Sequence, residues 1–68
     1  MNKYEVRKID LRECKTIDER NRAYESADVK VCVGLHEVWD YCGLRLHRNR
    51  AGYSGVINGI EYVAVRVE

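Results

Sequence analysis

The middle of the chain carries two cysteines and two histidines, and these are side chains that proteins often use to bind zinc. They are Cys32, His36, Cys42 and His47, in the pattern C-x3-H-x5-C-x4-H. This spacing matches no standard zinc finger or zinc knuckle, and a helix through the segment would place His36 opposite the face that carries Cys42. We therefore predict buried thiols and exposed histidines here, with no metal ion and no cofactor.

A cysteine near a histidine and a carboxylate is also the constellation of a cysteine nucleophile. Cys42, His36 and Asp40 supply these three groups. The sequence has no glycine-rich nucleophile turn, no phosphate-binding loop and no paired-carboxylate motif. A chain of 68 residues also has little room for a deep substrate pocket. The sequence therefore predicts a protein that is not an enzyme.

The segment with the most distinctive composition is residues 44–55, LRLHRNRAGYSG, which is rich in arginine and has no acidic residue. Arginine guanidinium groups donate paired hydrogen bonds to phosphates and carboxylates, so a cluster of them favours a negatively charged partner. The residues predicted to bind that partner are Arg45, His47, Arg48, Arg50 and Tyr53. The other interpretation is a polar connection between two elements, in which the arginines are simply solvated.

Residues 38–50, VWDYCGLRLHRNR, resemble a helix-turn-helix unit with a glycine at the turn and a basic second helix. The hairpin sequence that follows, GVINGIEYVAV, stands where such units carry a wing. In this respect about half of the chain is similar to small DNA-binding modules of phages, including excisionase-like proteins and modules appended to homing nucleases. The resemblance implies that the basic residues face duplex DNA while Tyr53 and Asn58 lie on the wing. The chain departs from the pattern where it has Trp39 instead of a small residue and Asn49 instead of an apolar one.

In size and general build the chain also resembles the small α+β proteins with which phages inhibit bacterial defence, including anti-CRISPR proteins, although no motif matches. This resemblance implies a non-enzymatic inhibitor that occupies a surface of a host protein or nucleoprotein complex, in the cytoplasm of the host cell. The chain has 12 Lys and Arg residues against 11 Asp and Glu. With a net charge of only +1, its surface as a whole is not basic. That balance favours the inhibitor over the DNA-binding protein, and we carry both interpretations forward.

Regular elements on both sides must position the basic segment. Alternation of apolar and polar residues at residues 3–11 and 29–33 predicts two strands. Between them, Thr16 and Glu19 have the spacing of a capping box. This box predicts a helix over residues 17–27 that lies on the surface and covers a sheet.

A second helix and a hairpin flank the basic segment directly. Apolar residues at helical spacing form one continuous face over residues 35–42, and Gly43 leaves open whether the helix extends further. Asn58 and Gly59 form the dipeptide preferred in a type I′ turn. They predict a hairpin whose second strand covers residues 60–67.

The order of elements, β-α-β-α-β-β, predicts an α+β fold in which residues 1–68 form one domain, with two helices and about four strands in a mostly antiparallel sheet. The last strand is apolar on both faces, which is typical of a central strand. Either both helices cover one side of the sheet, or one face of that strand meets a second copy of the chain in a homodimer. Three cysteines at irregular spacing and the lack of a long apolar run predict a reduced, cytoplasmic protein with no membrane partner and no export leader.

Overall fold

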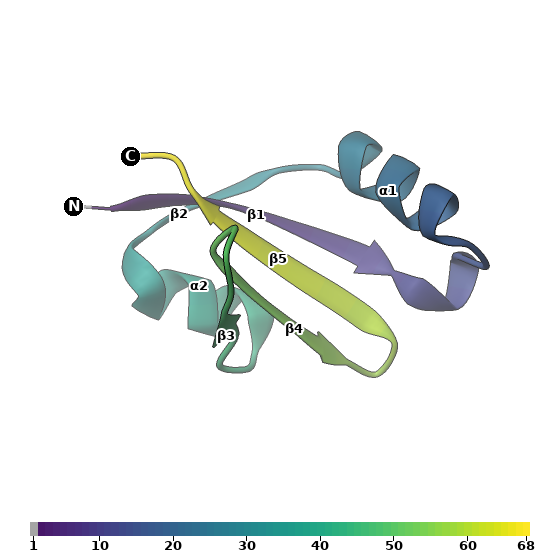
Figure 1. The fold of residues 1–68 in the computed structure, drawn as a ribbon. Helices are drawn as coiled ribbons and strands as arrows, with labels where there is room; N and C mark the ends of the chain where they lie inside the picture. The colour runs from purple at the N-terminus through teal and green to yellow at the C-terminus, as the bar shows by residue number, and fades with distance from the viewer. Residues whose placement is uncertain (1) are drawn as a thin grey trace.

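A computed structural model describes residues 2–68 as one antiparallel sheet with two α-helices packed on it (Figure 1). The strands are β1 (Lys3–Asp10), β2 (Lys30–Val33), β3 (His47–Arg48), β4 (Tyr53–Ile57) and β5 (Ile60–Arg66). The helices are the short 3-10 helix η1 (Leu11–Glu13), α1 (Ile17–Ser26) and α2 (Gly34–Cys42). The strand order is β2-β1-β5-β4-β3. The predicted α+β single domain is confirmed, and its sheet has five strands where about four were predicted.

The centre of the sheet is β5, as its apolar residues on both faces predicted. It pairs with β1 along its whole length, from Tyr4 opposite Arg66 to Asp10 opposite Ile60, and with β4 on its other side. The turn between β4 and β5 has φ of 52° at Asn58 and 79° at Gly59. Positive φ at both central residues is the conformation of a type I′ turn, so the predicted hairpin is confirmed.

Both predicted helices are present, and each has a defined end. α1 begins where the Thr16 hydroxyl accepts a hydrogen bond from the Glu19 N–H at 3.2 Å, as the capping box predicted. α2 ends at Gly43, which has a φ of 73° and donates its N–H to the carbonyl of Trp39 at 2.8 Å. A left-handed glycine at this position turns the chain away from the helix axis. The helix therefore does not extend beyond Cys42.

The prediction of a second, basic helix after Gly43 is wrong. Within residues 44–50 the described chain has only an extended segment that leads into β3. Alternate side chains of this segment lie on the same face, as in a strand: Leu44 and Leu46 both lie over Gly55 of β4. A Cβ atom added to Gly55 would lie 3.4 Å from a methyl group of Leu44 and 3.0 Å from one of Leu46. Packing of these two leucines on β4 holds the segment as an edge strand instead of a helix.

The two helices lie on opposite faces of the sheet. α2 packs Val38 and Cys42 against Val6 of β1 and Ala64 of β5, which oppose each other in the sheet. Side chains alternate along a strand, so the neighbouring positions face α1. The arrangement with both helices on one side is therefore wrong. The core under α2 consists of Tyr4, Val6, Cys32, Val38, Cys42, Leu46 and Ala64.

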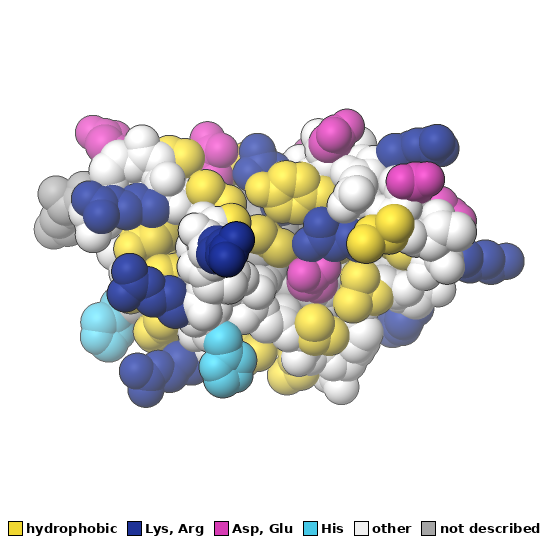
Figure 2. Space-filling model, in the orientation of Figure 1, with side chains coloured by type: hydrophobic (Ala, Val, Ile, Leu, Met, Phe, Trp, Pro, Cys, Tyr) yellow, Lys and Arg dark blue, Asp and Glu magenta, His cyan; other side chains and the backbone are white. Residues whose placement is uncertain are grey.

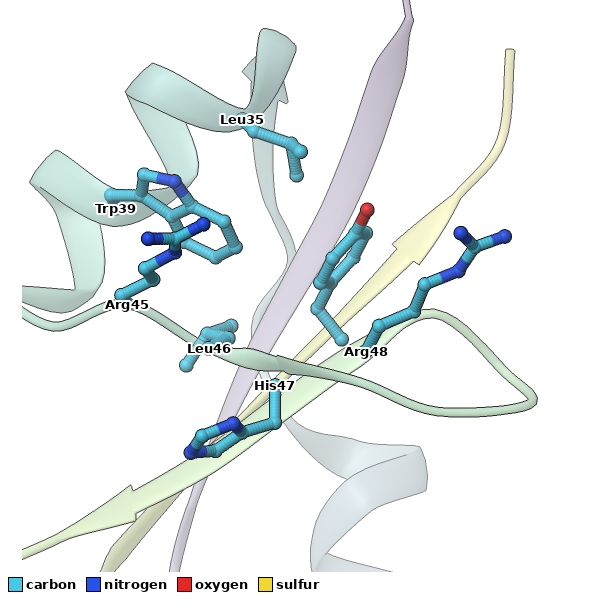
Figure 3. Close-up of a pocket in the computed structure, with 7 residues that line it drawn as sticks. Leu35, Trp39, Arg45, Leu46, His47 and Arg48 are labelled. Carbon is cyan, nitrogen blue, oxygen red and sulfur yellow. The ribbon is translucent and has the colours of Figure 1, made fainter.

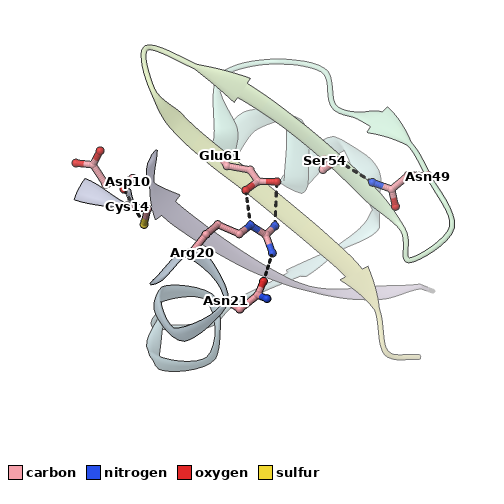
Figure 4. A network of polar contacts seen from close by, with 7 residues as sticks. All are labelled: Asp10, Cys14, Arg20, Asn21, Asn49, Ser54 and Glu61. Atoms are coloured by element: carbon pink, nitrogen blue, oxygen red, sulfur yellow. Dashed lines mark hydrogen bonds and ion pairs between the residues drawn. The ribbon is translucent and has the colours of Figure 1, made fainter. Parts of the chain in front are cut away.

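Polar contacts hold α1 on its face of the sheet. The Arg20 guanidinium donates two hydrogen bonds of 3.0 Å to the carboxylate of Glu61 on β5 (Figure 4). The guanidinium carbons of Arg7 and Arg20 lie 5.0 and 5.6 Å from the centre of the Tyr24 ring. Ile17, the first residue of this helix, is 76% exposed. A bidentate ion pair and cation–π contacts thus take part in holding the helix on the sheet.

The edge strand β2 buries Cys32 and exposes its valines. Val31 and Val33 are 54% and 36% exposed, and both lie on the α1 face, beyond the region that α1 contacts. The predicted homodimer through an open apolar face stays a prediction. Neither α-helix described within residues 2–68 is long and apolar enough to cross a membrane.

Candidate functional site

The basic segment is placed by the pairing of β3 with β4. His47 lies opposite Ser54, and Arg48 lies opposite Tyr53. Directly opposed residues share a face of the sheet, and Tyr53 in turn opposes the core residue Ala64. Arg48 and Tyr53 therefore lie on the α2 face, whereas the His47 side chain points to the other face.

A four-residue turn joins β3 to β4 and carries Arg50. The Asn49 carboxamide oxygen accepts the N–H groups of Ala51 and Gly52, both at 3.0 Å, and its NH2 group donates to the Ser54 hydroxyl at 2.7 Å (Figure 4). A side chain at Gly52 would overlap the carbonyl oxygen of Ala64, so the turn lies directly against β5. These contacts give the turn one defined conformation.

A hollow of about 530 Å³ lies between α2 and β3. In Figure 3, Leu35 and Trp39 of α2 face the segment that carries Leu46 and Arg48, while the His47 ring points away from them. Trp39 and Tyr53 meet edge to face with ring centres 5.6 Å apart, so the hollow has an aromatic wall. Its lining residues are Leu35, Trp39, Arg45, Leu46, His47, Arg48 and Tyr53.

A second hollow of about 390 Å³ adjoins the first and shares Leu35, Arg48 and Tyr53 with it. Its other lining residues are Asn2, Tyr4, Asn49, Arg50, Ala51, Gly52 and Arg66. We call the two hollows together the arginine groove, because Arg45, Arg48, Arg50 and Arg66 line it and no Asp or Glu does.

Three of these arginines have no acidic partner among the described residues. The ion pairs within residues 2–68 are Lys3–Glu68, Glu5–Arg7, Asp10–Arg12 and Arg20–Glu61, and Arg45, Arg48 and Arg50 belong to none of them. All three are exposed. Figure 2 shows Lys, Arg and His side chains gathered at the lower left of the molecule, with no acidic side chain visible among them. The groove is therefore a locally basic region on a chain with a net charge of only +1.

No family model, curated protein or solved structure matches this chain. What the groove can bind therefore follows from its own geometry.

The structure brings together most of the predicted partner-binding residues. Arg45, Arg48 and Tyr53 line the first hollow, and Arg50 lines the second. His47 borders the first hollow, but its side chain lies on the opposite face of β3. Leu46 is buried and its neighbours are exposed, which is the alternation of a strand. Had the segment been predicted as a strand, the sequence would have placed His47 on the face opposite Arg48.

Leu35, Trp39 and Arg66 are among the lining residues of the groove that were not predicted as site residues. Leu35 and Trp39 had been assigned to the apolar stripe of α2, which is correct, and both also reach the groove. Arg66 lies opposite Tyr4 in the sheet and comes to the groove only through the pairing of β5 with β1. No local sequence pattern connects it with the basic segment.

The four residues considered for zinc do not form a site. Cys32 and Cys42 are buried at 1% and 5% exposure, while His36 and His47 are exposed. Within residues 2–68 no group of three or more His, Cys, Asp or Glu side chains could hold a metal ion. Burial raises the pKa of the Cys42 thiol to about 11, which keeps it protonated and poorly nucleophilic at neutral pH.

Proposed function

We propose that this protein is a non-enzymatic binding protein that docks its arginine groove on an anionic surface of a larger partner and acts by occupying that surface. The observation that carries the proposal is the set of four arginines around an aromatic wall with no carboxylate in the lining. The lining of the groove supplies positive charge and no acidic group to offset it, so an anionic partner would be attracted to it. Guanidinium groups supply paired donors for carboxylates or phosphates.

The class of function that we propose is inhibition of a host protein or nucleoprotein complex by steric occlusion, as in the small phage-encoded inhibitors. A domain of 68 residues with a rigid contact surface is sufficient for this task, because occlusion needs affinity and bulk but no reacting groups. The Asn49 turn supports the proposal, since its hydrogen bonds fix the backbone that carries Arg50 before the partner arrives. A duplex-reading helix-turn-helix is not part of the proposal, because residues 44–50 lack the recognition helix.

The proposal is tested by comparing two variants with the same change in net charge. One variant replaces Arg45, Arg48 and Arg50 by Ala, and the control replaces three exposed cations outside the groove, Lys8, Lys15 and Arg22. Each protein is immobilised and incubated with a bacterial lysate, and captured components are identified by mass spectrometry. We expect a stoichiometric component that the unmodified protein and the control retain and the arginine variant loses. Equal capture by both variants, or no stoichiometric component on the unmodified protein, would contradict the proposal.

A further inference from the structure

We infer that the ligand of the arginine groove is a short single-stranded nucleic acid, with a base in the first hollow and backbone phosphates on the arginines. The inference rests on the proposed function, because it names the chemistry of the anionic surface that the groove contacts. Besides charge, two features carry it: the aromatic wall and the division of the groove into two connected hollows.

The first hollow offers a planar group an apolar and aromatic site. Tyr4, Tyr53 and Trp39 form a row of rings, with centres 6.1 and 5.6 Å apart. Trp39 and Tyr53 are only partly buried, so part of each ring is accessible from the hollow. Bases of any sequence bind to such aromatic surfaces through their faces. An acidic protein surface would satisfy the arginines, but Asp and Glu side chains bring no planar ring to this wall.

The arrangement of the arginines matches a polymer in which flat groups alternate with anions. Arg48 lines both hollows, whereas Arg45 lines only the first and Arg50 only the second. A strand that follows the groove therefore meets Arg45 at the first hollow, Arg50 and Arg66 at the second, and Arg48 at both. Volumes of about 530 and 390 Å³ lie within the range of sites that hold small planar ligands. Two successive nucleotides fit this division better than one compact ligand does.

The groove favours a single strand over a duplex. In a duplex the base faces are stacked and inaccessible, so a duplex would present only phosphates and groove edges to Trp39. Arg45, Arg48 and Arg50 lie on β3 and its flanking segments, Arg66 lies on β5, and among residues 44–50 there is no helix to enter a major groove. The hydrogen bonds of Asn49 fix the turn that carries Arg50, which lowers the entropic cost of binding.

Trp39 makes the inference directly measurable, because it is the only tryptophan of the chain. Oligouridylate and oligothymidylate of about eight nucleotides are titrated into the protein at about 50 mM salt, while tryptophan fluorescence and the anisotropy of labelled oligonucleotide are followed. The comparison ligands are a duplex of the same length and polyglutamate. We expect saturable quenching of Trp39 by at least one single strand, and weaker binding of the duplex and of polyglutamate.

Variants separate base stacking from charge. Replacing Tyr53 by Leu should weaken single-strand binding by about tenfold or more, because it removes an aromatic face. Replacing Arg48 by Ala should weaken it and lower the slope of log affinity against log salt by about one unit. Tyr41→Leu is the matched control, since Tyr41 is 41% exposed and lies outside the groove. Circular dichroism establishes that each variant is folded, and Arg48→Ala tests the inference if Tyr53→Leu does not fold.

Several outcomes would overturn the inference. Binding of polyglutamate or duplex as tight as that of the single strands, saturation without quenching of Trp39, or equal affinity of Tyr53→Leu and Tyr41→Leu would each do so. Its failure is distinguishable from failure of the proposed function. If the arginine variant loses a lysate component that the control keeps, while no single strand binds, the groove contacts a protein and only the inference falls.

Discussion

Cys42 lies between α2 and the sheet, and because its thiol is buried the protein should become less stable as the pH rises into the alkaline range. Burial raises the pKa of its thiol from the ordinary value of 9.0 to about 11. A group whose pKa is raised in the folded state contributes stability that is complete below its unfolded pKa and is lost as the pH rises through the folded value. The free energy of unfolding should therefore fall by about 2 kcal/mol from this thiol between about pH 8 and pH 11.

The measurement is urea unfolding of the unmodified protein and of Cys42→Ala across this pH range. The variant should be less stable at neutral pH, because it loses a buried sulfur, and the difference should shrink as the pH rises. Cys14→Ala is the control for removal of a thiol, since Cys14 is only partly buried. A difference for Cys42→Ala that stays constant with pH would show that the thiol titrates alike in both states.

Single residues of the candidate site were predictable where chemistry alone identifies them. Arg45, Arg48, Arg50 and Tyr53 were predicted from side-chain type and clustering, and the structure places them along one groove. Arg66 was not predictable, because its place depends on a pairing across more than half of the chain. What these residues bind stays a prediction.

At the level of elements, α1 depends on the Arg20–Glu61 pair, whose side chains are 30% and 18% exposed. A bidentate and partly buried pair contributes more than a fully exposed one. A double-mutant cycle with Arg20→Gln, Glu61→Gln and the double variant should give a coupling energy of about 1 kcal/mol by chemical denaturation. Amide exchange in α1 should become faster in each single variant, while exchange in α2 should change little. Additive effects of the two substitutions would mean that the pair does not hold the helix.

Elements with strong local signals were predicted and β3 was not. α2 has a continuous apolar face, α1 has a cap, and the β4–β5 hairpin has an Asn-Gly turn; each of these signals acts within a few residues. β3 has only two residues, and its neighbourhood of arginines and leucines is compatible with a helix as well. Gly43 and the packing of Leu46 on β4 favour the strand over the helix. The packing of Leu46 is a tertiary contact, which the local sequence does not reveal.

At the level of the whole molecule, helices on opposite faces leave part of the sheet uncovered. The α1 face carries Val31 and Val33 on β2 and, next to β1, Val67, which is 51% exposed. The predicted homodimer would cover this face, and sedimentation equilibrium at about 100 μM tests it. We expect an associating protein whose dimer is abolished by Val31→Lys and retained by Ile17→Lys, which changes an even more accessible residue on α1. A monomer at this concentration, or equal effects of both substitutions, would contradict the dimer.

The central position of β5 has a consequence for the time at which the protein can fold. Ile60–Arg66 is the last strand along the chain, yet it joins β1 to β4, and without it the sheet divides into the β1–β2 and β3–β4 pairs. Two-stranded pieces of this kind are marginally stable at best in water. During synthesis, therefore, the first 59 residues cannot form the complete sheet as long as β5 is still inside the ribosome. Until that strand emerges, Val6 of β1 lacks its core neighbour Ala64, so the core under α2 stays open in the nascent chain and closes only when β5 inserts.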